Sequence, residues 1–168
     1  MTQHSAQHLV SAVALGDHGI NTHSFSLNEN GPVSYIDLML PSDNTDSSDT
    51  PLPSVDETMS AIETRVNELI RDNLSMTPTW LQPNDPLFQT SVRSRLLPSN
   101  ISGLIRLVKI GGGSHTTNLK DDNVVDFNTC CGTHVPSLGH LQAVKFFRTE
   151  GLKGGSSVRV YFSAAKRL

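Results

Sequence analysis

Two short motifs, one near each end of the sequence, place the strongest constraint on how this chain can fold. His4 and His8 are four residues apart in a segment with helical periodicity, so both imidazoles fall on one face of that helix. Cys130 and His134 are also four apart, and Gly132 between them permits a tight turn in which the two side chains converge. Thiolate and neutral imidazole are ligands that Zn²⁺ favours, usually four in a tetrahedral arrangement. Together the motifs predict a zinc site of three histidines and one cysteine.

Each motif also has an ordinary explanation when it is taken alone. Seven histidines in 168 residues produce such spacings by chance, and a buried cysteine beside a surface histidine needs no metal. The chain has two cysteines, and they are adjacent in sequence. Adjacent cysteines make poor disulfide partners, so nothing in the sequence indicates a disulfide scaffold.

Apolar periodicity predicts a mixture of helices and antiparallel strands. We expect helices at residues 2–15 and from 54 or 56 to about 74, and strands at 22–27, 33–40, 105–110, 142–147 and 157–163. Residues 80–100, which include three prolines, have no clear pattern. The order of helices and hairpins favours an α+β fold, a two-layer sandwich of a mainly antiparallel sheet with packed helices.

Two polar stretches interrupt this pattern. Residues 40–54 are rich in Ser, Asp, Thr and Pro, and residues 111–123 begin with three glycines. Neither composition can bury a core, so we expect both to be flexible surface insertions. A chain of 168 residues is long enough for one domain and short for two, which predicts a single domain over 1–168.

The net charge of −3 conceals an uneven distribution. Residues 1–92 have two basic and twelve acidic side chains (−10), and residues 93–168 have eleven basic and four acidic ones (+7). This asymmetry is compatible with one face for a polyanion, or with opposite charges that meet across the fold and cancel. The N-terminus lacks the pattern of a signal peptide, and no apolar run approaches the roughly 20 residues of a membrane helix. We therefore expect a cytoplasmic protein with no membrane partner.

Several segments resemble one family. HSAQHL at residues 4–9 and CCGTHV at 130–135 resemble the HxxxH and CxGTH motifs of the editing domain shared by alanyl- and threonyl-tRNA synthetases, also called their second additional domain. The nearest resemblance is to the free-standing alanyl-tRNA editing proteins of the AlaX type. THSFSL at 22–27 is placed where that family has a pocket-lining strand. GLIRLVKI at 103–110 resembles the strand that leads to the cysteine turn, and residues 138–168 resemble the closing hairpin.

The resemblance implies an activity, a cofactor and a partner. It implies hydrolysis in trans of the ester that joins serine or glycine to tRNA for alanine. The partner it implies is the acceptor end of the mischarged tRNA, and no protein partner can be inferred from it. It implies that Zn²⁺ binds to His4, His8, Cys130 and His134. Cys131 occupies a position that is often glycine in the synthetases, so we expect a small buried thiol rather than a fifth ligand.

Substrate contacts are expected from Thr22, Ser24 and Thr133, although a threonine or serine in a strand is also an ordinary structural residue. Two other functions remain open. One is threonine-type editing of Ser-tRNA(Thr), and the other is a non-catalytic tRNA-binding module with a structural zinc, because closed four-ligand sites are usually structural.

Longer relatives have a small β-barrel before the zinc helix, whereas the helix predicted here begins at residue 2. The resemblance is therefore to a short-type member or to a fragment of a longer protein. The basic second half of the chain offers side chains for the phosphates of the acceptor stem. These are Lys145, Arg148, Lys153, Arg159, Lys166 and Arg167.

Overall fold

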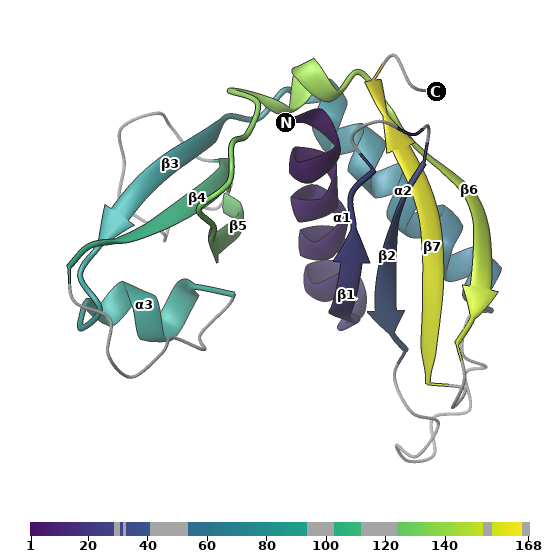
Figure 1. The fold of residues 1–168 in the computed structure, drawn as a ribbon, viewed down its shortest axis with the longest axis horizontal. Coiled ribbons are helices and arrows are strands. Elements are labelled where there is room, and N and C mark those ends of the chain that lie inside the picture. Colours follow the sequence, from purple (N-terminus) through teal and green to yellow (C-terminus); the bar gives the residue numbers. More distant parts are fainter. Residues whose placement is uncertain are drawn as a thin grey trace.

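Helices and antiparallel strands alternate along the chain, which confirms the predicted α+β fold. The computed structural model describes residues 1–28, 31, 33–40, 54–93, 103–111, 124–152 and 156–165. The elements, in chain order, are α1 (Thr2–His18), β1 (Asn21–Ser26), β2 (Ser34–Met39), α2 (Val55–Arg71), β3 (Met76–Leu81), α3 (Pro86–Ser91), β4 (Ile105–Gly111), β5 (Val124–Thr129), the 3-10 helix η1 (Leu138–Leu141), β6 (Val144–Gly151) and β7 (Ser157–Ala164). The strands form two sheets, in the orders β1-β2-β7-β6 and β3-β4-β5 (Figure 1).

The four-stranded sheet and the two long helices form the larger layer pair. α1 packs against β1, β2 and β7, and α2 packs against β6 (Figure 1). Alternate residues of the central strands face these helices and are buried, as the period of a strand requires. They include Ile36, Leu38, Val158, Val160 and Phe162.

α1 ends later than the sequence predicted. The helix continues through Gly16 to His18, and Gly19 caps it with φ +67°. That left-handed conformation strongly favours glycine, which is why Gly19 rather than Gly16 ends the helix. α2 begins where it was expected, because Ser54 and Glu57 form a reciprocal capping box.

The sequence predicted neither β3, a strand of the small sheet, nor α3, which lies within the unassigned residues 80–100. β3 accommodates Pro78 because an edge strand does not need every N–H as a donor. α3 begins at Pro86, and the Asp85 side chain accepts a hydrogen bond from the N–H of Leu87. With β4 and β5 these elements enclose a small second core of Leu81, Phe88, Val92, Ile105, Leu107 and Phe127.

The strand that leads to the cysteine turn differs from the expectation. Residues 103–110 were expected to precede the turn, but β4 is the middle strand of the small sheet. The strand that ends immediately before Cys130 is β5, which pairs with β4 antiparallel. The residues 41–53 and 112–123, on which the two predicted insertions fall, lie outside the described residues. In the part of the chain that is described, no helix is long and apolar enough to cross a membrane.

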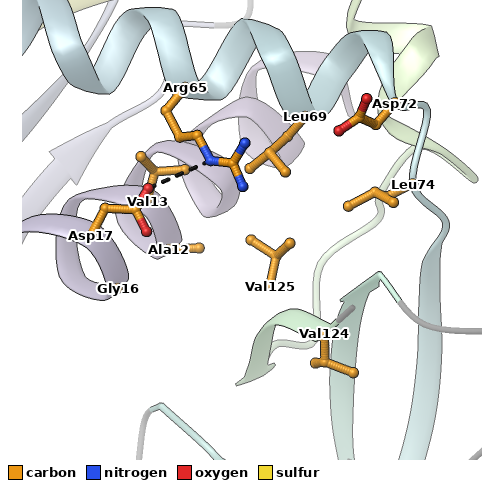
Figure 2. Close-up of a pocket in the computed structure, with 10 residues that line it drawn as sticks. All are labelled: Ala12, Val13, Gly16, Asp17, Arg65, Leu69, Asp72, Leu74, Val124 and Val125. Atoms are coloured by element: carbon orange, nitrogen blue, oxygen red, sulfur yellow. Dashed lines mark ion pairs between the residues drawn. The ribbon is translucent and has the colours of Figure 1, made fainter. Parts of the chain in front are cut away.

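A groove lies between the two long helices, α1 and α2, and the start of β5. It has a volume of about 380 Å³ and is bordered by Leu69 and Leu74 on one side and by Val124 and Val125 on the other (Figure 2). At its rim, Arg65 Nε of α2 lies 3.6 Å from Asp17 Oδ2 of α1. α1 also contacts β5 directly. α1 is therefore packed against both sheets, and residues on its sides can meet residues from either one.

Some charges of the two halves of the chain meet across the fold. Arg159 Nε on β7 donates to Asp37 Oδ1 on β2 at 2.7 Å, and Lys145 Nζ lies 2.7 Å from Glu63 Oε1. Arg148 Nη2 is paired with Glu150 at 3.0 Å. The other three basic residues considered for phosphate contact, at positions 153, 166 and 167, lie outside the described residues. Two of these pairs, Arg159 with Asp37 and Lys145 with Glu63, join the two halves and match the alternative in which opposite charges cancel, whereas Arg148 and Glu150 both belong to the basic half.

We expect Asp37→Asn to lower the free energy of unfolding by about 2 kcal/mol, because the part-buried Arg159 loses its charged partner. The hydrogen bond from Arg159 holds the pKa of Asp37 below its ordinary value of 3.8, with Ser24 contributing in the same direction. The contribution is therefore complete above that pH and is lost as pH falls through the lowered pKa. Urea unfolding at neutral and acidic pH measures the loss of stability and its dependence on pH. The difference in the free energy of unfolding between wild type and Asp37→Asn should be smaller in acid.

The control for this variant is Asp17→Asn, which removes the carboxylate of the exposed pair with Arg65. A change below about 0.5 kcal/mol is expected there, since exposed ion pairs contribute little. Equal losses in the two variants, or a loss at Asp37 that does not change with pH, would contradict the prediction.

Candidate metal centre

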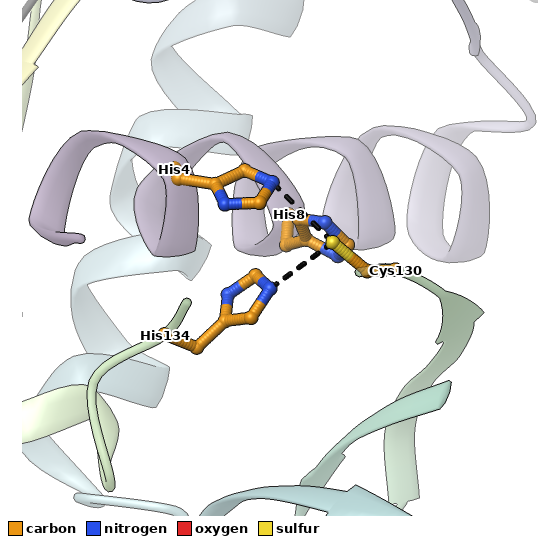
Figure 3. Close-up of side chains that lie close together, drawn as sticks. All are labelled: His4, His8, Cys130 and His134. Carbon is orange, nitrogen blue, oxygen red and sulfur yellow. Dashed lines mark hydrogen bonds between the residues drawn. The ribbon is translucent and has the colours of Figure 1, made fainter. Parts of the chain in front are cut away.

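Four side chains from distant parts of the sequence converge beside α1 (Figure 3). His4 and His8 project from α1, Cys130 directly follows β5, and His134 lies four residues further on. One potential ligand atom of each lies within 4.8 Å of the others, and the three imidazole centroids are 4.4–5.0 Å apart. The structure thus brings together all four residues that the sequence predicted as ligands.

The distances in this cluster suit a tetrahedral ion. Cys130 Sγ lies 3.5 Å from Nε2 of His4 and 3.3 Å from Nε2 of His134. Bonds of about 2.0–2.1 Å from Zn²⁺ to nitrogen and about 2.3 Å to sulfur, at tetrahedral angles, place the two ligand atoms roughly 3.5 Å apart. Three imidazoles and one thiol are also the donor types that Zn²⁺ prefers. The residues therefore fit the ion that the sequence predicted.

Gly132 permits the close approach of the turn to α1. A Cβ atom on this residue would lie 2.7 Å from His4 Nδ1 and closer still to His4 Cε1. The sequence suggested that glycine is needed for a tight turn, whereas the structure shows that the imidazole ring fills the space a side chain would need. The N–H of Gly132 also donates to Cys130 Sγ at 3.3 Å.

Two further side chains fix the turn. Arg106 on β4 donates from Nη1 to the carbonyl oxygens of Cys130 at 2.6 Å and Gly132 at 2.9 Å. Ser5 on α1 has its Oγ 3.3 Å from Nδ1 of His134, so the atom of the ring that faces away from the cluster is also engaged. These contacts orient the cysteine and the histidine before any ion binds.

A buried ion pair lies behind His8. Nδ1 of His8 is 4.0 Å from Oδ2 of Asp126 and makes no hydrogen bond among the described residues. Arg93 Nε and Nη2 donate to Asp126 Oδ1 at 2.8 Å and Oδ2 at 2.9 Å. A carboxylate next to the outer nitrogen of a histidine is the usual support for a metal ligand. The sequence interpretation missed this pair; an aspartate in the apolar run Val124–Phe127 was the available signal.

The protonation states favour cation binding. Burial, with a smaller contribution from the neighbouring histidines and arginines, lowers the pKa of His8 to about 2 and that of His134 to about 4. Both rings are therefore neutral near pH 7, which is the form that binds metals. Burial raises the pKa of the Cys130 thiol, so cation binding here releases a proton.

Comparison with known proteins shows which proteins this chain resembles. Residues 105–161 match the threonyl and alanyl tRNA synthetase second additional domain. Over all 168 residues the chain is 36% identical to the alanyl-tRNA editing protein Aarsd1 of Danio rerio, and over 169 aligned residues it is 36% identical to that of Mus musculus. The chain is therefore similar along its whole length to alanyl-tRNA editing proteins and contains a match to the second additional domain. It spans about a third of the length of these relatives (34% of each).

The similarity to the family covers both parts of the metal centre. The matched domain, residues 105–161, includes Cys130 and His134, and the full-length relatives also align with α1 and its two histidines. An alanine–tRNA ligase of Rickettsia typhi is 29% identical over 99 residues, 59% of this chain and 10% of the ligase. Members of this family thus include sequences within and outside a synthetase.

Three residues of the cluster, His4, His8 and Cys130, line a cavity of about 950 Å³. Thr22 and Ser24, two of the predicted substrate contacts, line the same cavity. A β-bulge between them changes the pairing of β1 with β2, and five consecutive residues, 21–25, border the cavity. The Ser24 hydroxyl donates to Asp37 Oδ2 at 2.6 Å, and the Thr22 hydroxyl lies 2.7 Å from Ser11 Oγ.

The other predicted contact, Thr133, does not line that cavity. Its exposed side chain borders a second cavity of about 470 Å³, together with His134 and Arg106. The expectation for Cys131 was wrong: its side chain is exposed rather than buried. Successive side chains of an extended segment point in opposite directions, so Cys130 faces the cluster and Cys131 faces away.

Proposed function

We propose that this protein hydrolyses the ester of mischarged tRNA for alanine in the cytoplasm, acting in trans on tRNA that carries serine or glycine. The supporting observation is the convergence of His4, His8, Cys130 and His134, because three of these residues, His4, His8 and Cys130, line a cavity that can receive a ligand. The relatives named above are alanyl-tRNA editing proteins, and the similarity extends over the whole of this chain.

Within this proposal the four side chains hold a zinc ion. When bound, the ion supplies a Lewis acid that polarises the ester carbonyl or orients the aminoacyl end. Four protein ligands complete a tetrahedral shell, and an aminoacyl ester is already an activated ester. We therefore assign the protein the task of positioning the ester beside an attacking water.

Thr22 and Ser24 are assigned to substrate contact. Because the Ser24 hydroxyl hydrogen is donated to Asp37, the oxygen of Ser24 faces a ligand as an acceptor. The Thr22 hydroxyl, held beside Ser11, can donate to and accept from a ligand hydroxyl. A role for Thr133 stays a prediction, with its position next to His134 as the reason to test it.

The need for such a site follows from the size of the two amino acids. Serine differs from alanine by one hydroxyl, and an apolar synthetic pocket rejects an added hydroxyl by only about 100-fold. A second pocket that hydrogen-bonds the hydroxyl rejects the ligand that lacks it by about 10⁴-fold or more. Selective removal of serine with alanine spared is therefore the expected behaviour.

The test is deacylation of Ser-tRNA(Ala), Gly-tRNA(Ala), Ala-tRNA(Ala) and Ser-tRNA(Thr) by one preparation whose zinc content is determined. We expect one bound zinc, rapid loss of serine from tRNA(Ala), slower loss of glycine, which also lacks the hydroxyl, and Ala-tRNA(Ala) spared. Preferential hydrolysis of Ser-tRNA(Thr) would indicate threonine-type editing. Bound zinc with no hydrolysis of any substrate would reject the proposal and indicate a structural zinc.

Replacing Thr22 by valine is expected to slow serine release by about 10–100-fold while changing glycine release by less than about threefold. The substitution removes the hydroxyl at nearly constant volume, and glycine has no side-chain hydroxyl to lose a partner. Single-turnover deacylation of Ser-tRNA(Ala) and Gly-tRNA(Ala) measures the ratio. Equal slowing of both would mean that Thr22 maintains the shape of the cavity instead.

A further inference from the structure

Gln7 lies between the two histidines of α1 and has an unpaired, buried oxygen. Its side chain lines the cavity of about 950 Å³ beside the metal centre, and the residue is only 4% exposed. Nε2 donates to Ser11 Oγ at 2.9 Å. Oε1 has no hydrogen-bond partner among the described residues. Buried amide oxygens are nearly always paired, and the position of Gln7 in the cavity lining leaves its oxygen available to a ligand there.

Gln7 belongs to a chain of polar side chains on one wall of the cavity. Ser11 Oγ receives the hydrogen bond from Gln7 and lies 2.7 Å from Oγ1 of Thr22. In the structure Nε2 of Gln7 faces Ser11, which leaves Oε1 for a ligand. A ligand on this wall therefore meets the amide oxygen of Gln7 at one end of this row of side chains and the hydroxyl of Thr22 at the other.

The lining of the cavity limits which ligand group can use this acceptor. Its polar side chains are His, Gln, Ser, Asn, Thr, Arg and Cys, and none of the described residues that line it is an aspartate or a glutamate. An ammonium group that enters the cavity must replace its bonds to water with bonds to protein acceptors. No carboxylate is present on this wall to supply them, whereas Gln7 Oε1 is buried and unpaired.

We propose that Gln7 Oε1 accepts a hydrogen bond from the α-ammonium group of the aminoacyl ester. The inference rests on the proposed function and specifies its substrate class: esters of amino acids with a free α-amino group. N-acylated aminoacyl esters, which lack the ammonium and add bulk at that point, are excluded. Gln7 thus recognises a group that serine and glycine share, while Thr22 recognises the hydroxyl that distinguishes them.

The experiment uses the full protein chain loaded with zinc. It measures the affinity of this protein for three non-hydrolysable compounds, each an amide of 3′-amino-3′-deoxyadenosine. They carry a seryl group, a glycyl group, and 3-hydroxypropionyl, which is seryl without its amine. Wild type is expected to bind the seryl amide at least about tenfold more tightly than the des-amino compound, the size of a hydrogen bond to a charged group. Gln7→Leu should remove that preference and weaken the binding of the seryl and glycyl amides equally. Gln7→Glu, which retains an acceptor oxygen, should restore the preference for the seryl amide.

Gln3→Leu is the matched control. Gln3 lies on the same helix, is 6% exposed and also has an unpaired Oε1, but it bonds to Ser163 and Ala164 of β7 and does not line the cavity. This variant should keep the wild-type preference for the seryl amide. Thermal unfolding of each variant identifies any loss that comes from the fold.

The outcomes separate this inference from the proposed function. An unchanged ratio of seryl to des-amino affinity in Gln7→Leu would overturn the role of Gln7, even if the protein hydrolyses Ser-tRNA(Ala). Weaker binding of the seryl amide alone, with the glycyl amide unaffected, would assign Gln7 to the side-chain hydroxyl and overturn it as well. A Gln7-dependent preference in a protein that hydrolyses no aminoacyl-tRNA would support it while rejecting the catalytic proposal.

Discussion

Cys130→Ser protein is expected to keep its fold, to lose its bound zinc and to hydrolyse Ser-tRNA(Ala) at least about 100-fold more slowly than wild type. The thiolate is one of four converging ligands, and a serine hydroxyl is a much poorer ligand for Zn²⁺. Changes in groups that only support a ligand already cost about 10–100-fold, so loss of a ligand should cost more. Metal analysis of the purified protein and single-turnover deacylation measure the two effects.

Cys131→Ser is the matched control, because the two cysteines are adjacent and only Cys130 faces the cluster. The exposed Cys131 thiol should be replaceable with no change in zinc content or deacylation. Circular dichroism distinguishes loss of metal from loss of fold. Zinc retained at the wild-type level in Cys130→Ser, or equal loss in both variants, would show that the ligand set is wrong.

The elements that the sequence predicted well are those with long, regular patterns. α2 has a full amphipathic stripe and a capping box, and each central strand of the larger sheet buries apolar residues at alternate positions, Ile36 and Leu38 in β2 and Val158, Val160 and Phe162 in β7. The four residues of the cluster were predicted because each pair is local, one on a helix turn and one in a tight turn. β3 and α3 contain prolines and β5 contains a buried aspartate, so none of them has a clear apolar period, and the packing that selects them comes from residues distant in sequence.

The support of the metal centre was not predictable for a similar reason. Arg93 is 33 residues from Asp126, and Arg106 is 24 residues from Cys130. No local spacing links such partners, and each is an ordinary residue type at a surface or in a strand. They become recognisable only when β4 pairs with β5, which places Arg106 next to the turn, and when the N–H of Arg93 bonds to the Phe127 carbonyl, which places Arg93 next to Asp126. The unpaired oxygen of Gln7 is likewise a property of packing rather than of spacing.

Gly132→Ala is expected to weaken zinc binding by about 10–100-fold while leaving the rest of the fold intact. The added Cβ would lie 2.7 Å from Nδ1 of His4, well inside contact distance, so the ring or the turn must move. Either movement separates His4 from Cys130, whose Sγ is 3.5 Å from Nε2 in the wild type. The size of the effect follows from what displaced supporting groups cost at other metal sites. Competition with a chromophoric chelator measures the affinity.

Gly16→Ala is the control for the same chemical change at a glycine with room around it. Gly16 lies in α1, and a Cβ there would meet nothing within 4 Å. Alanine in a helix interior should stabilise the fold by about 0.5–1 kcal/mol, with no change in zinc affinity. The contrast isolates the contact with His4 as the cause. If Gly132→Ala bound zinc as tightly as wild type, the close approach of the turn to α1 would not be what positions His4, and the helix alone would have to orient both of its histidines.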